Sequence, residues 1–322
     1  MNQTEKDLLL TKFNKKIVFF PSYQHAWSQM QKSVQTTALR RSPSCAFIMG
    51  MTGAGKSTLC ELFRDSFGEP FTAVEHNGIQ KNIPALYVLP TAAITIKSLC
   101  EDMLSKFMER VPRLSQSELT HLLEVKIKQC NVKVIIFDEI QRLMRPDALK
   151  TKQGTLDWVV ALLSHTGLPI ILCGDESCQT LLEEEATKNS PFARRYCYIA
   201  ILEYFSYNDD TENEYHLSLS ELNKIAHSLL PIKGGVNFHD SDIKLPIYIA
   251  SSGILEYIRQ ILNEALDICL SRAHPILQKS DFADAFHCLW LPKNLSKSGI
   301  NPFEISTSEC LKIIDTHTKN KQ

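Results

Sequence analysis

Residues 45–63 read CAFIMGMTGAGKSTLCELF, and the centre of this stretch is Gly50-Met51-Thr52-Gly53-Ala54-Gly55-Lys56-Ser57. It matches the pattern G-x-x-x-x-G-K-[ST] at every fixed position. The apolar run before it predicts a buried strand, and the run from Thr58 to Phe63 predicts a helix, which is the context that this motif requires. In such a loop, backbone N–H groups and a helix N-terminus converge on one point and stabilise phosphate. We therefore expect residues 50–58 to bind a nucleoside triphosphate, with Lys56 near the β- and γ-phosphates and the Ser57 hydroxyl on Mg²⁺.

A second informative stretch runs from Val132 to Glu139 and reads VKVIIFDE. A continuous β-branched run of this kind is typical of a central parallel strand covered on both faces. Because parallel α/β sheets present their ligands at the carboxyl ends of the strands, Asp138 and Glu139 are expected at the same edge as the phosphate loop. We expect Asp138 to hold Mg²⁺ together with Ser57, and Glu139 to orient and polarise the water that attacks the γ-phosphate.

The rest of the chain alternates strands with helices up to about residue 202 and is helical afterwards. This alternation predicts an α/β fold with a parallel sheet, helices on both faces and right-handed crossovers. Further strands are expected at 84–90, 168–175 and 197–202, and helices at 23–39, 91–108, 115–129, 218–229, 246–251, 253–273 and 280–289. We expect four regions: an N-terminal basic arm and helix (1–43), an α/β nucleotide-binding domain (44–206), a small helical lid (207–292) and a flexible C-terminal tail (293–322).

Composition limits the classes of function. The 322-residue chain has a net charge of −1, so any nucleic-acid contact must come from local clusters, such as residues 1–41 with seven Lys/Arg against two acids. The ten cysteines form no C-x-x-C and no Cys/His pattern typical of a structural metal site, which predicts a reducing compartment. No apolar stretch approaches the roughly 20 residues of a membrane helix. We therefore expect a soluble cytoplasmic protein without membrane partners.

Several further segments, taken with these two motifs, carry a family resemblance. They are Phe19-Phe20-Pro21, Pro84 to Pro90, Ile140-Gln141-Arg142-Leu143, Gly167 to Gly174, Phe192-Ala193-Arg194-Arg195-Tyr196 and Ser252-Gly253-Ile254-Leu255. In order and spacing the chain resembles the AAA+ ATPases, and among them the TnsC/TniB transposition regulators, in particular the short TnsC proteins of CRISPR-associated transposons. The resemblance implies a bacterial ATPase whose copies form rings or helical filaments around double-stranded DNA when ATP is bound. It also implies partners: the target selector TniQ with its guide complex, the transposase TnsB, and TnsA.

The resemblance also implies roles for residues outside the two motifs. Arg194 or Arg195 would reach a neighbouring copy's γ-phosphate, which makes the interface head to tail, and Arg195 matches the family pattern better. Asp175 follows the strand whose tip commonly carries Asn or Thr as the sensor of the γ-phosphate. A carboxylate there would repel phosphate, so either Asp175 orients the attacking water or the sensor lies elsewhere. Arg259 is a candidate second sensor or a solvated helix residue. Candidate DNA contacts, each of which could instead be an ordinary solvated charge, are Lys97, Arg142, Arg145, Lys150 and Lys152.

Other classes of function also use a phosphate loop. A replication initiator or clamp loader shares the fold and would be expected to carry a winged-helix region after the lid. A STAND-type switch would exchange ADP for ATP without binding DNA. A small-molecule kinase would need a pocket for a phosphate acceptor, whereas Asp138-Glu139 and an arginine pair favour water as the acceptor.

Overall fold

A computed structural model describes residues 2–75, 78–90, 95–143, 149–208, 210, 212–296 and 299–319. The chain divides into two compact units: Ser22–Leu202 form an α/β unit, and the segments before and after it form a helical unit. The division differs from the expected one at the N-terminus, because the first 21 residues belong with the helices that follow Leu202.

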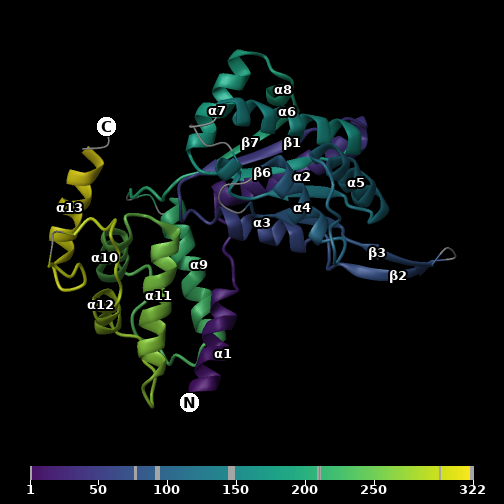
Figure 1. The fold of residues 1–322 in the computed structure, drawn as a ribbon. Coiled ribbons are helices and arrows are strands. Elements are labelled where there is room, and N and C mark those ends of the chain that lie inside the picture. Colours follow the sequence, from purple (N-terminus) through teal and green to yellow (C-terminus); the bar gives the residue numbers. More distant parts are fainter. Residues whose placement is uncertain are drawn as a thin grey trace. The chain divides into compact units, whose positions relative to one another are not determined.

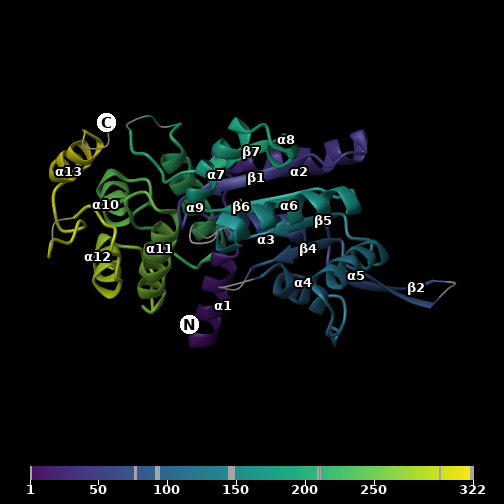
Figure 2. The same ribbon diagram turned by 45° about the horizontal axis from the view of Figure 1, so that its top comes forward.

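The α/β unit is built on a five-stranded sheet in the order β4-β5-β6-β1-β7, and every neighbouring pair is parallel. Figure 1 shows the fold, and Figure 2 labels β4 and β7, which form the two edges of the sheet. The strands are β1 Cys45–Gly50, β4 Ala85–Val88, β5 Val134–Phe137, β6 Ile170–Gly174 and β7 Tyr196–Leu202. All residues of β1, β5 and β6 are buried, as their unbroken apolar sequences predict. The sheet confirms the expected α/β P-loop fold.

Helices cover both faces of this sheet. The crossover through α3 runs from β1 to the edge strand β4, whereas the crossovers from β4 to β5, β5 to β6 and β6 to β7 run the opposite way. Because parallel crossovers are right-handed, α3 and the later helices lie on opposite faces. The later helices accordingly share one core with Phe47 of β1, to which each contributes a leucine: Leu99, Leu123, Leu162 and Leu181. The helices are α2 Pro21–Arg40, α3 Lys56–Asp65, α4 Ile96–Ser105, α5 Gln116–Gln129, α6 Leu149–Thr166, α7 Ser177–Thr187 and α8 Pro191–Arg195, with a 3₁₀ turn η1 at Ile140–Leu143.

A β-hairpin that was not predicted lies between α3 and β4. Its strands, β2 Phe71–Glu75 and β3 Gly78–Asn82, pair antiparallel, and the hairpin projects from the unit in Figure 1. Val74 and Ile79 face each other across it and are 86% and 79% exposed. Apolar residues on this hairpin are exposed instead of covering a core, so hydrophobic periodicity could not reveal it.

The helical unit contains α1 Gln3–Asn14, α9 Glu214–Leu229, α10 Ser241–Ser251, α11 Leu255–Leu270, α12 Lys279–Cys288 and α13 Thr307–Lys319. No helix was predicted within the first 22 residues of the basic arm, but a capping box between Asn2 and Glu5 begins α1, which packs on α9 and α11. The expected flexible tail instead contains α13, which packs on α10 and buries Cys310 and Ile314. Among the described residues, no helix is both long and apolar enough to cross a bilayer.

Candidate active site

The phosphate loop joins β1 to α3 and depends on glycine at three turning points. Gly50, Gly53 and Gly55 have φ angles of 152°, 84° and 89°, values that side-chain-bearing residues rarely adopt. A Cβ on Gly50 would lie 2.0 Å from the carbonyl oxygen of Leu202, so glycine is also required there for space. The buried Lys56 Nζ donates to the carbonyl oxygens of Gly50 at 2.8 Å and Met51 at 2.9 Å. Its ammonium group thus lies inside the curled loop.

A tyrosine from α2 supports the end of this loop. The Tyr23 hydroxyl donates to the Gly55 carbonyl oxygen at 2.9 Å. Burial raises the pKa of Tyr23, so the hydroxyl remains a donor at physiological pH. The sequence indicated only that Tyr23 begins a helix, and it offered no signal that links this residue to Gly55.

Asp138 lies at the carboxyl end of β5 and is 1% exposed. Its Oδ2 accepts a hydrogen bond from the Tyr87 hydroxyl at 2.8 Å, and its Oδ1 accepts one from the Glu139 backbone N–H, also at 2.8 Å. Burial, together with this bond to Asp138, raises the pKa of Tyr87, so the phenol stays protonated. A buried carboxylate and the exposed Ser57 hydroxyl at the start of α3 are the donor types that Mg²⁺ prefers, so these residues fit that ion.

Glu139 has an unusual backbone. Its φ is 53°, in the left-handed region that few residues other than glycine occupy, and such strain is often found at functional sites. Its Oε2 accepts a hydrogen bond from Gln141 Nε2 at 2.9 Å and lies 3.4 Å from Arg142 Nη2. The carboxylate is therefore held by two side chains of the η1 turn that follows it.

Gln141 connects Glu139 to the tip of the neighbouring strand. Its Oε1 accepts a hydrogen bond from the Asp175 backbone N–H at 3.2 Å. The Asp175 carboxylate accepts from the Ser177 backbone N–H at 3.0 Å and also from the Ser177 hydroxyl. Asp175 thus stabilises the first turn of α7 in this structure, and Gln141 is the side chain that bridges the two strand tips. The sequence contained Gln141 within a family segment but gave it no role.

The two arginines before β7 differ in their surroundings. Arg195 Nη1 donates to the Ser42 Oγ at 2.8 Å and to the Pro43 carbonyl oxygen at 3.4 Å, so its side chain is held by the loop before β1. Arg194 is exposed, and its guanidinium makes no hydrogen bond or ion pair with any described residue. The structure therefore distinguishes two residues that the sequence left as alternatives.

Arg259 lies in the helical unit and is not a solvated residue. Its Nη2 donates to the carbonyl oxygens of Phe13 at 3.1 Å and Asn14 at 3.0 Å, and its guanidinium lies 4.8 Å from the centre of the Phe13 ring. Burial lowers the pKa of Arg259. In this structure it caps the carboxyl end of α1, which is the position where a cation is favoured.

The candidate DNA contacts are not equivalent. Lys97 is exposed at the start of α4. Arg142 approaches Glu139 and donates to the Pro90 carbonyl oxygen at 3.2 Å, and Lys152 pairs with Glu184 at 2.8 Å. Arg145 and the Lys150 side chain lie outside the described part of the chain.

Comparison with known proteins agrees with this geometry. Residues 39–182 match a family model described as an AAA domain, and a comparison with curated proteins gives no match. The fold resembles the Aeropyrum pernix ORC1 protein, solved in complex with DNA, with a TM-score of 0.56 at 16% identity over 87% of this chain and 68% of that one.

Two further structures are similar. One is the Aeropyrum pernix ORC2 protein in its ADPNP–ADP complexes, with a TM-score of 0.59 at 13% identity over 89% of this chain and 72% of that one. The other is Cdc6p from Pyrobaculum aerophilum, with a TM-score of 0.58 at 14% identity over 87% of this chain and 70% of that one. The family model thus covers the part of the chain from residue 39 to residue 182, and the solved structures show that this chain shares their fold.

Proposed function

We propose that this protein is an ATP-hydrolysing AAA+ regulator whose copies assemble head to tail on duplex DNA. One observation carries the proposal: the P-loop after β1 and Asp138-Glu139 after β5 lie at the carboxyl edge of one parallel sheet, with only β6 between these two strands. The solved Aeropyrum pernix ORC1 complex with DNA gives support from a protein of the same fold.

Each residue has a distinct part in the proposed hydrolysis. Bound Mg²⁺ would neutralise charge on the β- and γ-phosphates, and Ser57 and Asp138 would hold it. Lys56 would exchange its two carbonyl partners for phosphate oxygens, since an ammonium forms stronger bonds with a charged acceptor. Glu139 would orient the attacking water and accept its proton, while Gln141 fixes the position of that carboxylate.

We assign the contact with the neighbouring copy's γ-phosphate to Arg194. Its exposure supports this assignment, whereas Arg195 is already bonded to Ser42 and Pro43. An arginine that acts in trans makes the interface heterologous, and such interfaces generate rings or helical filaments. Nucleotide occupancy would then control assembly. For DNA, the exposed Lys97 is the better supported contact, because Arg142 and Lys152 have acidic partners within the chain.

The experiment is electron microscopy of the protein with duplex DNA and a non-hydrolysable ATP analogue, paired with measurements of phosphate release. We expect rings or filaments with little sequence preference. Lys56→Ala should weaken ATP binding about 10- to 100-fold, because a charge-assisted contact contributes about 1.5–3 kcal/mol, and should abolish assembly. Glu139→Gln should keep binding and assembly but lower kcat about 10²- to 10⁴-fold.

Lys128→Ala, on the exposed side of α5, is the matched control and should behave like the unmodified protein. Monomers under all conditions, with ATP bound, would refute assembly on DNA. Unchanged hydrolysis in Glu139→Gln would assign the catalytic carboxylate to another residue.

Within this class we propose a TnsC/TniB-type regulator of transposition that connects TniQ to TnsB and TnsA. Support comes from the order and spacing of the segments between residues 19 and 255. A replication-initiator-like ATPase is the second candidate, and the likeness to ORC and Cdc6 proteins favours it equally. Binding of purified TniQ and TnsB to DNA-bound assemblies would support the first candidate. Assemblies on DNA that bind neither protein would support the second.

A further inference from the structure

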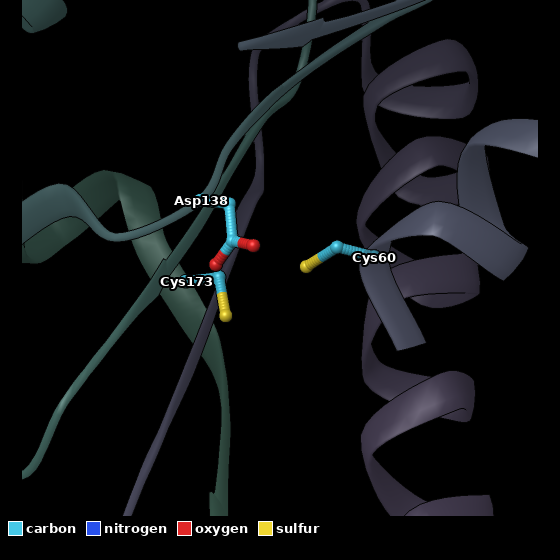
Figure 3. A group of neighbouring side chains, drawn as sticks. All are labelled: Cys60, Asp138 and Cys173. Atoms are coloured by element: carbon cyan, nitrogen blue, oxygen red, sulfur yellow. The ribbon is translucent and has the colours of Figure 1, made fainter. Parts of the chain in front are cut away.

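Two buried cysteines lie beside the carboxylate assigned to Mg²⁺. Cys60 is on α3, four residues after Lys56, so the two side chains share one face of that helix. Cys173 is in β6, and the pairing of Phe137 with Leu172 brings Asp138 next to it on the adjacent strand. Figure 3 shows the Cys60 side chain pointing from its helix toward the neighbouring side chains of Asp138 and Cys173. A sulfur from each cysteine and a carboxylate oxygen all lie within 4.8 Å of one another.

This donor set suits a different kind of cation from Mg²⁺. Zn²⁺ binds cysteine sulfur at about 2.3 Å and carboxylate oxygen at about 2.0 Å, which places tetrahedral donors roughly 3.5–3.8 Å apart. The donors of the cluster lie within 4.8 Å of one another, so side-chain shifts of about 1 Å or less would bring them to that spacing, and Cys60, Asp138 and Cys173 are at most 1% exposed. Mg²⁺ takes oxygen ligands and does not select thiolates, whereas Zn²⁺ does. The cluster therefore favours Zn²⁺ over Mg²⁺ by the chemistry of its donor atoms.

We propose that Cys60, Cys173 and Asp138 form a binding site for one thiophilic divalent cation, such as Zn²⁺, with a water in the fourth position. On binding, each thiol releases its proton to solvent and its sulfur becomes a metal ligand. Two thiolates, one carboxylate and the divalent ion leave a net charge of −1 in the cluster. The spacing of these three residues in the sequence matches no metal-site motif, because one ligand comes from a helix and the other two come from near the ends of two strands.

The site would regulate hydrolysis, and this part rests on the proposed function. Asp138 is the carboxylate assigned to Mg²⁺, so a cation held by the two sulfurs competes for the same side chain. A chain with Zn²⁺ bound would hydrolyse ATP more slowly than the same chain with Mg²⁺ alone. Removing either thiol would leave hydrolysis intact and relieve the inhibition.

The binding step is tested without nucleotide, by titrating the full chain with Co²⁺ and recording its absorption. We expect one Co²⁺ per chain, with a sulfur-to-metal charge-transfer band and the visible bands of tetrahedral Co²⁺. Cys60→Ala and Cys173→Ala should each weaken binding at least about tenfold. The matched control removes the exposed cysteines, as Cys197→Ser with Cys288→Ser, and should keep full binding.

Two outcomes would overturn the site: unchanged Co²⁺ binding in Cys60→Ala and Cys173→Ala, or loss of binding in the control. Circular dichroism checks that the variants fold, and X-ray absorption of the unmodified chain with Zn²⁺ gives a readout that needs no variant. It should show two sulfur neighbours per zinc, and any other number would contradict the proposal. If the protein proved not to hydrolyse ATP, the Co²⁺ and Zn²⁺ measurements would still decide whether the cation site exists.

Discussion

Gln141 offers a sharp test of how Glu139, the proposed catalytic carboxylate, is held. It donates to Glu139 Oε2 at 2.9 Å and accepts from the Asp175 backbone N–H at 3.2 Å. Gln141→Leu keeps a similar volume and removes both hydrogen bonds. The bond to the charged carboxylate contributes about 1.5–3 kcal/mol. If that energy keeps Glu139 in its reactive position, its loss should lower kcat about 10- to 100-fold, since about 1.4 kcal/mol corresponds to a factor of ten.

The assay is phosphate release at saturating DNA over a range of ATP concentrations. We expect KM to stay within about threefold, because Gln141 has no hydrogen bond to the P-loop, so the loss should fall on kcat. Gln179→Leu is the matched control: this glutamine bonds Glu183 on the exposed side of α7, and its replacement should change neither constant.

A double variant separates positioning from general damage to the fold. If Gln141 acts through Glu139, then Gln141→Leu should have little further effect on kcat once Glu139→Gln is present. A kcat that falls by the same factor in both backgrounds would refute the positioning role, and so would a single variant that keeps kcat within about twofold.

Two further predictions concern arginines in the two units. Arg194→Ala should lower the DNA-stimulated kcat at least about 10³-fold and leave ATP affinity unchanged. Arg195→Ala should mainly lower the free energy of unfolding, by about 1 kcal/mol, because it removes the hydrogen bonds to Ser42 and Pro43. The opposite pattern in kinetics and thermal unfolding would assign the contact with the neighbouring copy's γ-phosphate to Arg195. Arg272→Ala removes the two 2.6 Å hydrogen bonds that Arg272 donates to Asp281, whose side chain is 1% exposed, and should destabilise the helical unit by about 2–3 kcal/mol. Lys224→Ala removes an exposed ion pair with Glu221 and should change the free energy of unfolding by under about 0.5 kcal/mol. Equal unfolding free energies for the two variants would contradict the prediction.

The main strands and the P-loop followed from local patterns in the chain. Unbroken apolar runs at Cys45–Gly50 and Val134–Phe137 form central strands because the sheet is covered on both faces. Helix α1 and the β2–β3 hairpin escaped prediction for the opposite reason. α1 is mostly polar and is stabilised by distant partners, including the ion pair of Lys6 with Asp267 at 2.9 Å, and the hairpin presents apolar side chains to solvent.

The order of residues alone determined the P-loop and the paired acids after β5, because each depends on neighbours within one short segment. It also determined the parallel α/β fold, because strands and helices alternate along the chain. Tertiary structure decided which arginine is exposed, which side chains hold Glu139 and which thiols lie beside Asp138. These depend on contacts such as Arg195 with Ser42, which are 153 residues apart. Contacts of this kind leave no periodic signal, since the sheet order that brings the segments together is set by the packing of the whole unit.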